Sequence, residues 1–385
     1  MSIVSTKINQ LDLFSGIGGF HLGFERAGFE VTSYFSEIDK HAVAVYQHKF
    51  KDATYVGSVT DVRGADLPNI DLITFGSPCQ DFSLAGKRKG MDGERSSLIL
   101  EAIRLITECR PRAFVWENVK GTFSSNDGED FAAILQAFAN IGGYRLEWQL
   151  LNTSWFLPQN RERIYLVGYS TTPGGDWGGV FPISIKPGKD NGIPKQNPTT
   201  YTITNPQRDG NGSYISERSE STKGLKPLKI KVANKKGYQE AEDGDAIRLY
   251  QPNSETQRGR VGKGVAHTLE TTGQQGVVQP VQIGQSSQTF AHKSGTLIGE
   301  DGQDAFTIRS SNPNGVKDQN YRIRRLTPIE CERLQGFPDN HTEYGIYDGE
   351  VKKMSNTQRY KQCGNAVTVD VVKAVAQQLI PIYNA

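Results

Sequence analysis

The chain has 385 residues, which is long enough to bury a sizeable core and suggests two domains or one domain with a large insertion. Its formal net charge of +2 excludes a uniformly basic nucleic-acid-binding protein, so a nucleic-acid partner would need a local basic face. Its four cysteines show neither CxxC spacing nor a nearby histidine at zinc spacing. We therefore expect no metal site and no disulfide framework. Without a signal-peptide pattern or an apolar run of membrane-spanning length, we also expect a cytoplasmic protein.

Residues 1–168 alternate between strand-like and helix-like segments, a pattern typical of a mostly parallel sheet covered by helices. The expected strands are Gln10–Phe14, Val31–Ser36, Ile70–Phe75, Ala113–Trp116, Leu146–Leu151 and Ile164–Val167. The expected helices are Gly19–Ala27, Lys40–Phe50, Ser97–Cys109 and Phe131–Asn140. The last of these has apolar residues at helical spacing, which indicates one buried face.

The composition changes after Gly168 and becomes rich in Gly, Pro, Asn, Gln, Ser and Thr. Short β-like pieces such as TYTIT and GVVQPVQI occur there, and their β-branched residues favour a small irregular β domain over a disordered linker. Helical character returns in LTPIECERLQGF and AVTVDVVKAVAQQLI. We therefore expect an α/β catalytic domain in two parts, 1–168 and 324–385, around an inserted domain at 169–323.

A glycine-rich turn follows the first expected strand in DLFSGIGGF, between Asp12 and Phe20. Glycines at the start of a helix let the backbone approach a ligand, although an ordinary tight turn would look the same. The dinucleotide pattern GxGxxG is not met, because His21 occupies the third glycine position. Glu37 ends the next strand, where this fold class uses an acid to bind ribose hydroxyls. Together, the turn and the acid favour an adenosine-containing cofactor over a surface or helix-capping acid.

The stretch GSPCQDFS places Cys79 directly after a proline at the end of an apolar strand. Open α/β sheets bind ligands at the carboxyl ends of their strands, and the proline would stiffen the turn that holds the sulfur. Most free cysteines are small buried hydrophobes, and Cys79 alone would favour that interpretation.

Two further strand ends carry charged residues. Glu117 ends the strand in WENVKG, where it could donate a proton or hold a ring nitrogen. In QNRERIYLVG, alternation places Arg161 and Arg163 on one face of a strand, which suits a phosphate or a nucleobase oxygen. A plain strand-end acid and a salt-bridged strand edge are the alternatives.

The order of these motifs resembles that of the C5-cytosine-specific DNA methyltransferases of bacterial type. The order is the glycine turn, Glu37, Pro-Cys-Gln, Glu-Asn-Val, Gln-x-Arg-x-Arg, the variable insert and GNAV. The resemblance covers nearly the whole chain except the insert. It implies a Rossmann-like α/β methyltransferase fold that uses S-adenosylmethionine, with a small, mostly β target-recognition domain inserted. It also implies a monomer that acts on a flipped-out cytosine in double-stranded DNA, with any cognate restriction endonuclease acting separately.

The resemblance also implies a role for each matching residue. Cys79 would be the nucleophile, Glu117 would meet cytosine N3 and Arg163 would contact the flipped base. The cofactor-binding residues would be Phe14, Gly16, Gly18, Gly19, Glu37, Ile38, Ser58, Val59, Pro78 and Asn365. The DNA-binding residues would be Gln80, Ser83, Lys87, Arg88, Lys89 and Arg161.

One position departs from the family pattern. In GSVTD the family often has an acid directly after the glycine, facing the cofactor's adenine amino group, whereas this chain has Ser58. Either the Ser58 hydroxyl substitutes for that acid or Asp61 reaches in.

Three rival interpretations remain. A tRNA cytosine methyltransferase of the same fold is the nearest, and the Glu-Asn-Val context and the large insert favour DNA over it. The absent third glycine counts against a nucleotide-dependent oxidoreductase. The full set of implied catalytic residues counts against an inactive DNA-binding protein.

Overall fold

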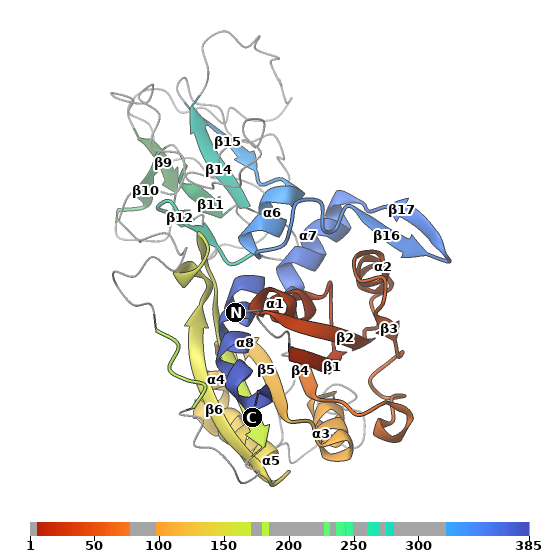
Figure 1. Ribbon diagram of the computed structural model, residues 1–385. Coiled ribbons are helices and arrows are strands. Elements are labelled where there is room, and N and C mark those ends of the chain that lie inside the picture. Colours follow the sequence, from red (N-terminus) through yellow and green to blue (C-terminus); the bar gives the residue numbers. More distant parts are fainter. Residues whose placement is uncertain are drawn as a thin grey trace, which may run out of the picture.

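The chain folds around a large mixed sheet with a smaller β sheet beside it (Figure 1). The computed structural model describes residues 6–77, 98–170, 179–184, 227–231, 236–242, 244–248, 260–269, 271, 275–280 and 321–384. The large sheet has seven strands in the order β3-β2-β1-β4-β5-β8-β6. In chain order they are β1 Thr6–Leu13, β2 Phe29–Ser36, β3 Thr54–Tyr55, β4 Leu72–Phe75, β5 Ala113–Val119, β6 Tyr144–Asn152 and β8 Glu162–Ser170.

The expected parallel arrangement holds from β3 to β5, where every neighbouring pair is parallel. Strand β8 runs antiparallel to both β5 and β6, which the sequence did not predict. The connection from β6 to β8 holds only residues 153–161, too few for the crossover that a parallel pair needs, so the two strands pair as neighbours in opposite directions. The end of β8 that carries Arg163 therefore lies beside the carboxyl end of β5.

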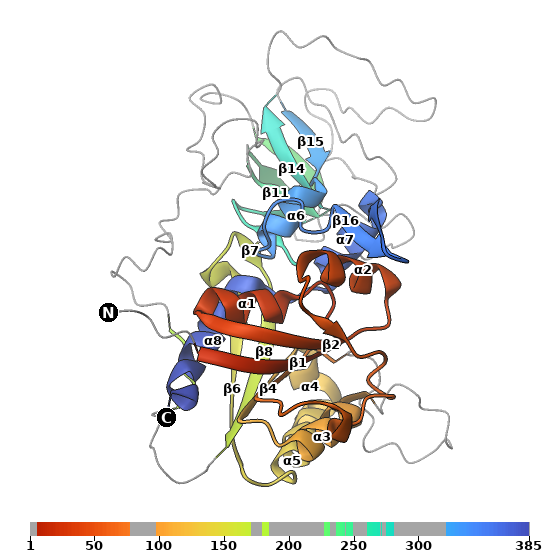
Figure 2. The same cartoon turned by 45° about the vertical axis from the view of Figure 1, so that its right-hand side comes forward.

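Helices cover both faces of the large sheet, as Figure 2 shows from a second direction. On one face, α1 (Gly19–Ala27) and α8 (Val369–Tyr383) pack on an apolar cluster that includes Phe24, Val167 and Val372. On the other, α3 (Leu98–Cys109) and α5 (Glu129–Ala139) bury Leu105 and Phe138. The α3 residues Ile99, Ala102, Leu105 and Ile106 are buried and recur at helical spacing, which explains why this segment forms an amphipathic helix. The remaining helices are α2 (Lys40–Lys49), α4 (Gly121–Ser124), α6 (Pro328–Leu334) and α7 (Asn356–Asn365).

The insert contributes a second, smaller sheet with strand order β12-β11-β14-β15. Its strands are β11 Ala246–Arg248, β12 Arg260–Gly262, β14 Gln275–Pro280 and β15 Tyr321–Arg325, and β9 Leu228–Lys231 pairs separately with β10 Tyr238–Ala241. Strand β14 covers much of GVVQPVQI, whereas TYTIT lies outside the described residues. Because β15 stays paired with β14 up to Arg325, it crosses the boundary expected at residue 323.

Two segments fasten the small sheet to the rest of the molecule. Strand β13 (Ala266–His267) pairs with β7 (Gln159–Asn160), which directly precedes β8. Helices α6 and α7 lie between the two sheets in both views (Figures 1 and 2). The hairpin of β16 (Tyr344–Tyr347) and β17 (Glu350–Lys353) follows α6 and packs on α2 through Gly345 and Ala44, and it was not predicted.

Among the described residues, no helix is both long and apolar enough to cross a membrane.

Candidate active site

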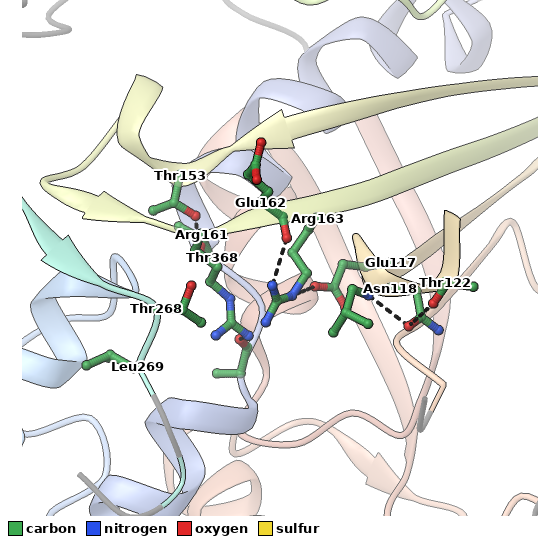
Figure 3. A network of polar contacts seen from close by, with 12 residues as sticks. Glu117, Asn118, Thr122, Thr153, Arg161, Glu162, Arg163, Thr268, Leu269 and Thr368 are labelled. Carbon is green, nitrogen blue, oxygen red and sulfur yellow. Dashed lines mark hydrogen bonds and ion pairs between the residues drawn. The ribbon is translucent and has the colours of Figure 1, made fainter. Parts of the chain in front are cut away.

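Glu117 and Arg163 meet at the edge of the large sheet where β5 ends. Glu117 pairs with Tyr165 and Val119 pairs with Arg163 in the β5–β8 ladder, so Glu117 and Arg163 project from the same face as diagonal neighbours. Their side chains form an ion pair, with 3.0 Å between Arg163 Nε and Glu117 Oε1 (Figure 3). Both side chains are mostly buried, at 15% and 10% exposure. The two residues for which the resemblance implies contacts to the flipped cytosine therefore lie side by side.

The Glu117 carboxylate keeps acceptor capacity in this buried position. Oε1 has no hydrogen-bond partner within the described part of the chain, because the Arg163 contact is an ion pair without hydrogen-bond alignment. Arg163 Nη1 donates instead to the Glu162 carbonyl at 2.7 Å. A buried carboxylate oxygen that accepts no hydrogen bond is costly, so this oxygen is suited to an N–H donor from a ligand.

Glu117 also lies beside the start of the predicted nucleophile turn. A Cβ atom added to Gly76 would come within 3.3 Å of Glu117 Oε2, so a side chain at position 76 would crowd the carboxylate. Pro78, Cys79, Gln80, Ser83, Lys87, Arg88 and Lys89 lie outside the described residues. The structure therefore places Gly76, three residues before Cys79, next to Glu117.

Ser77 anchors this approach and was not singled out by the sequence. Trp116 Nε1 donates to the Ser77 hydroxyl at 3.0 Å, and Asn118 Nδ2 donates to the Ser77 carbonyl at 3.2 Å. The Asn118 amide oxygen in turn accepts from Val119 N–H and from the Thr122 hydroxyl. Strand alternation places Trp116 and Asn118 on the face opposite Glu117. The asparagine directly after the strand-end acid in Glu-Asn-Val is the signal that could have identified this support.

Arg161 does not occupy the exposed position that a DNA contact would need. Its side chain is buried at 3% exposure, and its guanidinium donates to the carbonyls of Gly364 at 3.2 Å and Ala366 at 2.8 Å. Burial, with the Arg163 charge next, lowers the pKa of Arg161 to about 9, so the group remains a cation at neutral pH. Arg161 thus fixes the backbone on both sides of Asn365, which is itself exposed at the end of α7. Arg161 is buried rather than exposed to DNA because α7 packs onto this strand end, which the sequence did not reveal.

Gln159 links the same segment to the insert. Its amide donates to the Leu334 carbonyl at 2.7 Å and accepts from Leu269 N–H at 3.3 Å. The Thr268 hydroxyl also donates to the Asn160 carbonyl at 2.8 Å, and Figure 3 includes Thr268 and Leu269. The Gln-x-Arg-x-Arg segment therefore holds the insert, the C-terminal segment and Glu117 with three alternate side chains.

Glu37 holds the glycine turn between β1 and α1, a contact that the sequence did not predict. Glu37 Oε2 accepts from Gly16 N–H at 2.9 Å, and Oε1 accepts from Ile38 and Asp39 N–H. Oε2 keeps a free lone pair that could receive a ribose hydroxyl. Ile38 is 80% exposed, an unusual state for a large apolar side chain and one that suits stacking on a ligand ring.

The turn can also accept a ligand at close range. Phe14 and Gly16 have positive φ angles of 51° and 55°, and a Cβ atom built on Gly16 meets nothing within 4 Å. Gly18 and Gly19 differ, because added Cβ atoms there would strike Phe50 and Val367. Open space at Gly16, together with the Glu37 carboxylate, fits an adenosine-containing cofactor.

Ser58 lies in the loop after β3. Its hydroxyl is 2.9 Å from the Thr60 hydroxyl, which lies 3.3 Å from an Asp61 carboxylate oxygen. Val59 points into the core, and its carbonyl accepts from Arg104 Nη2 at 3.2 Å. Only the backbone of Val59 therefore remains for a ligand contact. In the described part of the chain, no cluster of metal-binding side chains occurs.

Comparisons with known proteins show the family of this chain. The family model described as C-5 cytosine-specific DNA methylase matches residues 8–381. The orphan methyltransferase M.SPRI of Bacillus phage SPR is 30% identical over 98% of each chain. The type II methyltransferase M.Bsp6I of Bacillus sp. (strain RFL6) is 30% identical over 95% of this chain and 96% of that one.

Among solved structures, the S. pombe Dnmt2 methyltransferase is similar, with a TM-score of 0.55 over 97% of this chain and 99% of that one. At 18% identity this likeness shows the fold alone. The family match gives the reaction, a DNA (cytosine-5)-methyltransferase activity that uses S-adenosylmethionine. The chain belongs to the C-5 cytosine-specific DNA methylase family.

Proposed function

We propose that Cys79 is the covalent nucleophile of this methyltransferase, that Glu117 and Arg163 hold the target cytosine, and that residues 169–323 select the DNA sequence. The observation that carries the proposal is the buried Glu117 carboxylate, paired with Arg163 and placed against Gly76, three residues before Cys79. A target atom inside a stacked duplex is out of reach, so the base must leave the helix at a cost of roughly a few kcal/mol.

The chemistry explains why these groups are needed together. Attack of the Cys79 thiolate on C6 breaks the aromatic ring and makes C5 nucleophilic. A free cysteine has a pKa of about 8.5, so the site must favour the thiolate or remove its proton during attack. Glu117 gives up a proton to N3 as C6 is attacked, and its Oε1 then accepts a hydrogen bond from N3–H, so the charge that attack would otherwise place on the ring is neutralised. S-adenosylmethionine supplies the methyl group, and loss of the C5 proton and of the cysteine restores the aromatic ring.

The cofactor is proposed to bind at the open side of the glycine turn. Gly16 allows close approach, Glu37 receives the ribose hydroxyls, and exposed Ile38 stacks on the adenine ring. The remaining members of the proposed site are Phe14, Gly18, Gly19, Ser58, Val59, Pro78 and Asn365. Gly18 and Gly19 contribute by shaping the turn, because the space beside each is filled by protein.

The insert is proposed to read base edges, while the flanking parts perform the chemistry. This division is supported by the separate small sheet of the insert and by β13, which pairs with β7 directly before β8. Replacing residues 170–323 with the insert of a relative should redirect methylation to that relative's sequence. A folded, active chimera that still methylates the original sequence would overturn this division. We further propose that the protein works as a cytoplasmic monomer, and that any cognate restriction endonuclease is a separate protein.

Trapping tests the nucleophile directly. A duplex carrying 5-fluorocytosine in place of cytosine should form an adduct that survives denaturation, because fluorine cannot leave as the proton does. Cys79→Ala should abolish the adduct. Cys109→Ala, which replaces a half-buried cysteine on α3, should retain it. An adduct with Cys79→Ala would refute the assignment. Transfer from labelled cofactor to tRNA but not to DNA would favour the RNA alternative.

A further inference from the structure

The Ser15–Gly19 turn has one open side and one packed side. The open side lies at Gly16, where an added Cβ atom meets no atom within 4 Å. On the packed side, Cβ atoms on Gly18 and Gly19 would lie 2.2 Å from the Phe50 ring and 2.5 Å from Val367 Cγ2. The shape offered to a ligand on the open side therefore depends on what presses on the packed side.

His341 makes a polar contact with this turn from the packed side. Its Nε2 lies 2.8 Å from the Ile17 carbonyl, although the two residues are 324 positions apart. A carbonyl only accepts hydrogen bonds, so the imidazole carries its proton on Nε2. Gly18 N–H, on the other side of the same peptide bond, donates to the Ser15 carbonyl at 3.1 Å. Both polar groups of the Ile17–Gly18 peptide are thereby fixed.

The loop that presents His341 is itself rigidly held. Asn340 N–H and Thr342 N–H both donate to the buried Glu332 carboxylate, at 2.8 and 2.9 Å. The imidazole packs on Phe337, with 4.5 Å between ring centroids. Residues on both sides of His341 are therefore anchored to α6, and the side chain points into the glycine turn as a fixed donor.

We propose that His341 is a positioning residue for cofactor binding, which keeps the Ile17 carbonyl turned to the packed side and so preserves the open side at Gly16. Without this donor, the buried carbonyl loses its partner, and the Ile17–Gly18 peptide gains freedom to rotate toward the open side. The inference rests on the proposed cofactor site at the glycine turn. It adds a residue from a distant loop that touches neither substrate nor the reacting atoms.

The test compares two replacements at one position. His341→Phe keeps a ring that packs on Phe337 but has no donor, whereas His341→Gln restores an N–H at a similar reach. Calorimetry with S-adenosylhomocysteine should give about tenfold weaker binding for His341→Phe and recovery to within about threefold for His341→Gln. Cofactor-free affinity for duplex DNA should stay unchanged in both. Binding stoichiometry reports the folded fraction of each variant. If His341→Phe does not fold, His341→Asn takes its place, because its amide is too short to reach the Ile17 carbonyl.

Tyr360→Phe is the matched control. The Tyr360 hydroxyl donates to the buried Leu326 carbonyl at 2.7 Å, so this variant also loses one side-chain bond to a carbonyl in the C-terminal part. It should lower thermal stability without weakening S-adenosylhomocysteine binding. Three outcomes for S-adenosylhomocysteine binding would each overturn the inference. His341→Phe binds as tightly as the wild type, His341→Phe and Tyr360→Phe lose the same affinity, or His341→Gln does not recover the affinity that His341→Phe loses. If the wild type binds the ligand and transfers methyl groups, such results leave the proposed function standing. A wild type that binds none would overturn both.

Discussion

At the proposed cytosine-binding end of the site, called the base end below, Glu117 and Arg163 come from hydrogen-bonded neighbouring strands, and the ladder alone brings them together. At the cofactor end, the Ser15–Gly19 turn takes its shape from Phe50, Val367 and His341, two of which lie in the C-terminal part of the chain. Changes at the base end should therefore affect chemistry directly. Changes at the cofactor end should instead affect cofactor binding, by altering how Phe50, Val367 and His341 pack on the Ser15–Gly19 turn.

The largest effect is expected at the base end. Glu117→Gln should lower turnover about 100-fold or more, because an amide cannot take part in proton transfer at N3. Duplex affinity and S-adenosylhomocysteine affinity should change little, since neither depends on that proton. Steady-state kinetics and binding measurements check both points. Glu162→Gln, which removes a neighbouring carboxylate paired with Lys120 near the surface, should keep nearly full turnover. Wild-type turnover in Glu117→Gln would remove this residue from the mechanism.

Arg161 binds the backbone on both sides of Asn365, so its replacement should affect folding. Arg161→Met leaves the Gly364 and Ala366 carbonyls without their donor, so the free energy of unfolding should fall by about 2–3 kcal/mol. Urea titration measures this loss, and Arg145→Met, at an exposed arginine on β6, should cost much less. A fully stable Arg161→Met protein with strongly weakened DNA binding would instead support the DNA contact expected from the sequence.

Acid should weaken the packed side of the glycine turn. Burial, reinforced by the charges of Lys49, Arg26 and His48, lowers the pKa of His341 from 6.5 to about 3. Between these values the unfolded chain binds a proton that the folded protein does not, so the stabilising contribution is complete above pH 6.5 and is lost as the pH falls toward 3.

The stability difference between wild type and His341→Gln should therefore shrink by about 2 kcal/mol from pH 7.5 to pH 5. Urea titrations at both pH values measure the change. For Tyr360→Phe the difference should remain constant. A His341→Gln difference that does not change with pH would mean that His341 is already protonated in the folded protein.

The smallest effect is expected at Ser58. A carboxylate accepts a stronger hydrogen bond than a hydroxyl, so Ser58→Asp should preserve or slightly tighten S-adenosylhomocysteine binding in calorimetry. Asp61→Asn is the companion variant, because Asp61 is linked to Ser58 through Thr60. A large loss of affinity in Ser58→Asp, together with a loss in Asp61→Asn, would mean that Asp61 already meets the adenine and that a second acid repels it.

Much of the architecture could be predicted from the sequence. Apolar runs and helical spacing placed β2, β4, β5, α1, α2, α3 and α5 close to their observed bounds, whereas β1 begins four residues before its expected start. The unpredicted β16–β17 hairpin also carried a signal, since Asp348 and Gly349 occupy its turn with positive φ angles, a pairing typical of tight hairpins. Strand β7 and the direction of β8 lacked such a signal, because pairing partners are not encoded in a single segment.

The site divides in the same way. The position of Glu37 at a strand end beside the glycine turn could be predicted from local pattern, and its carboxylate accepts from Gly16 N–H there. Glu117 meets Arg163 because β8 runs antiparallel to β5, a direction that the sequence did not predict. Whether Arg161 faces DNA or the end of α7, and which residue holds the Ile17 carbonyl, depends on segments about 200 and 324 positions away. Local pattern determines which way a side chain points, whereas burial and hydrogen-bond partners depend on which distant segment fills the space there. Only the tertiary structure decides that.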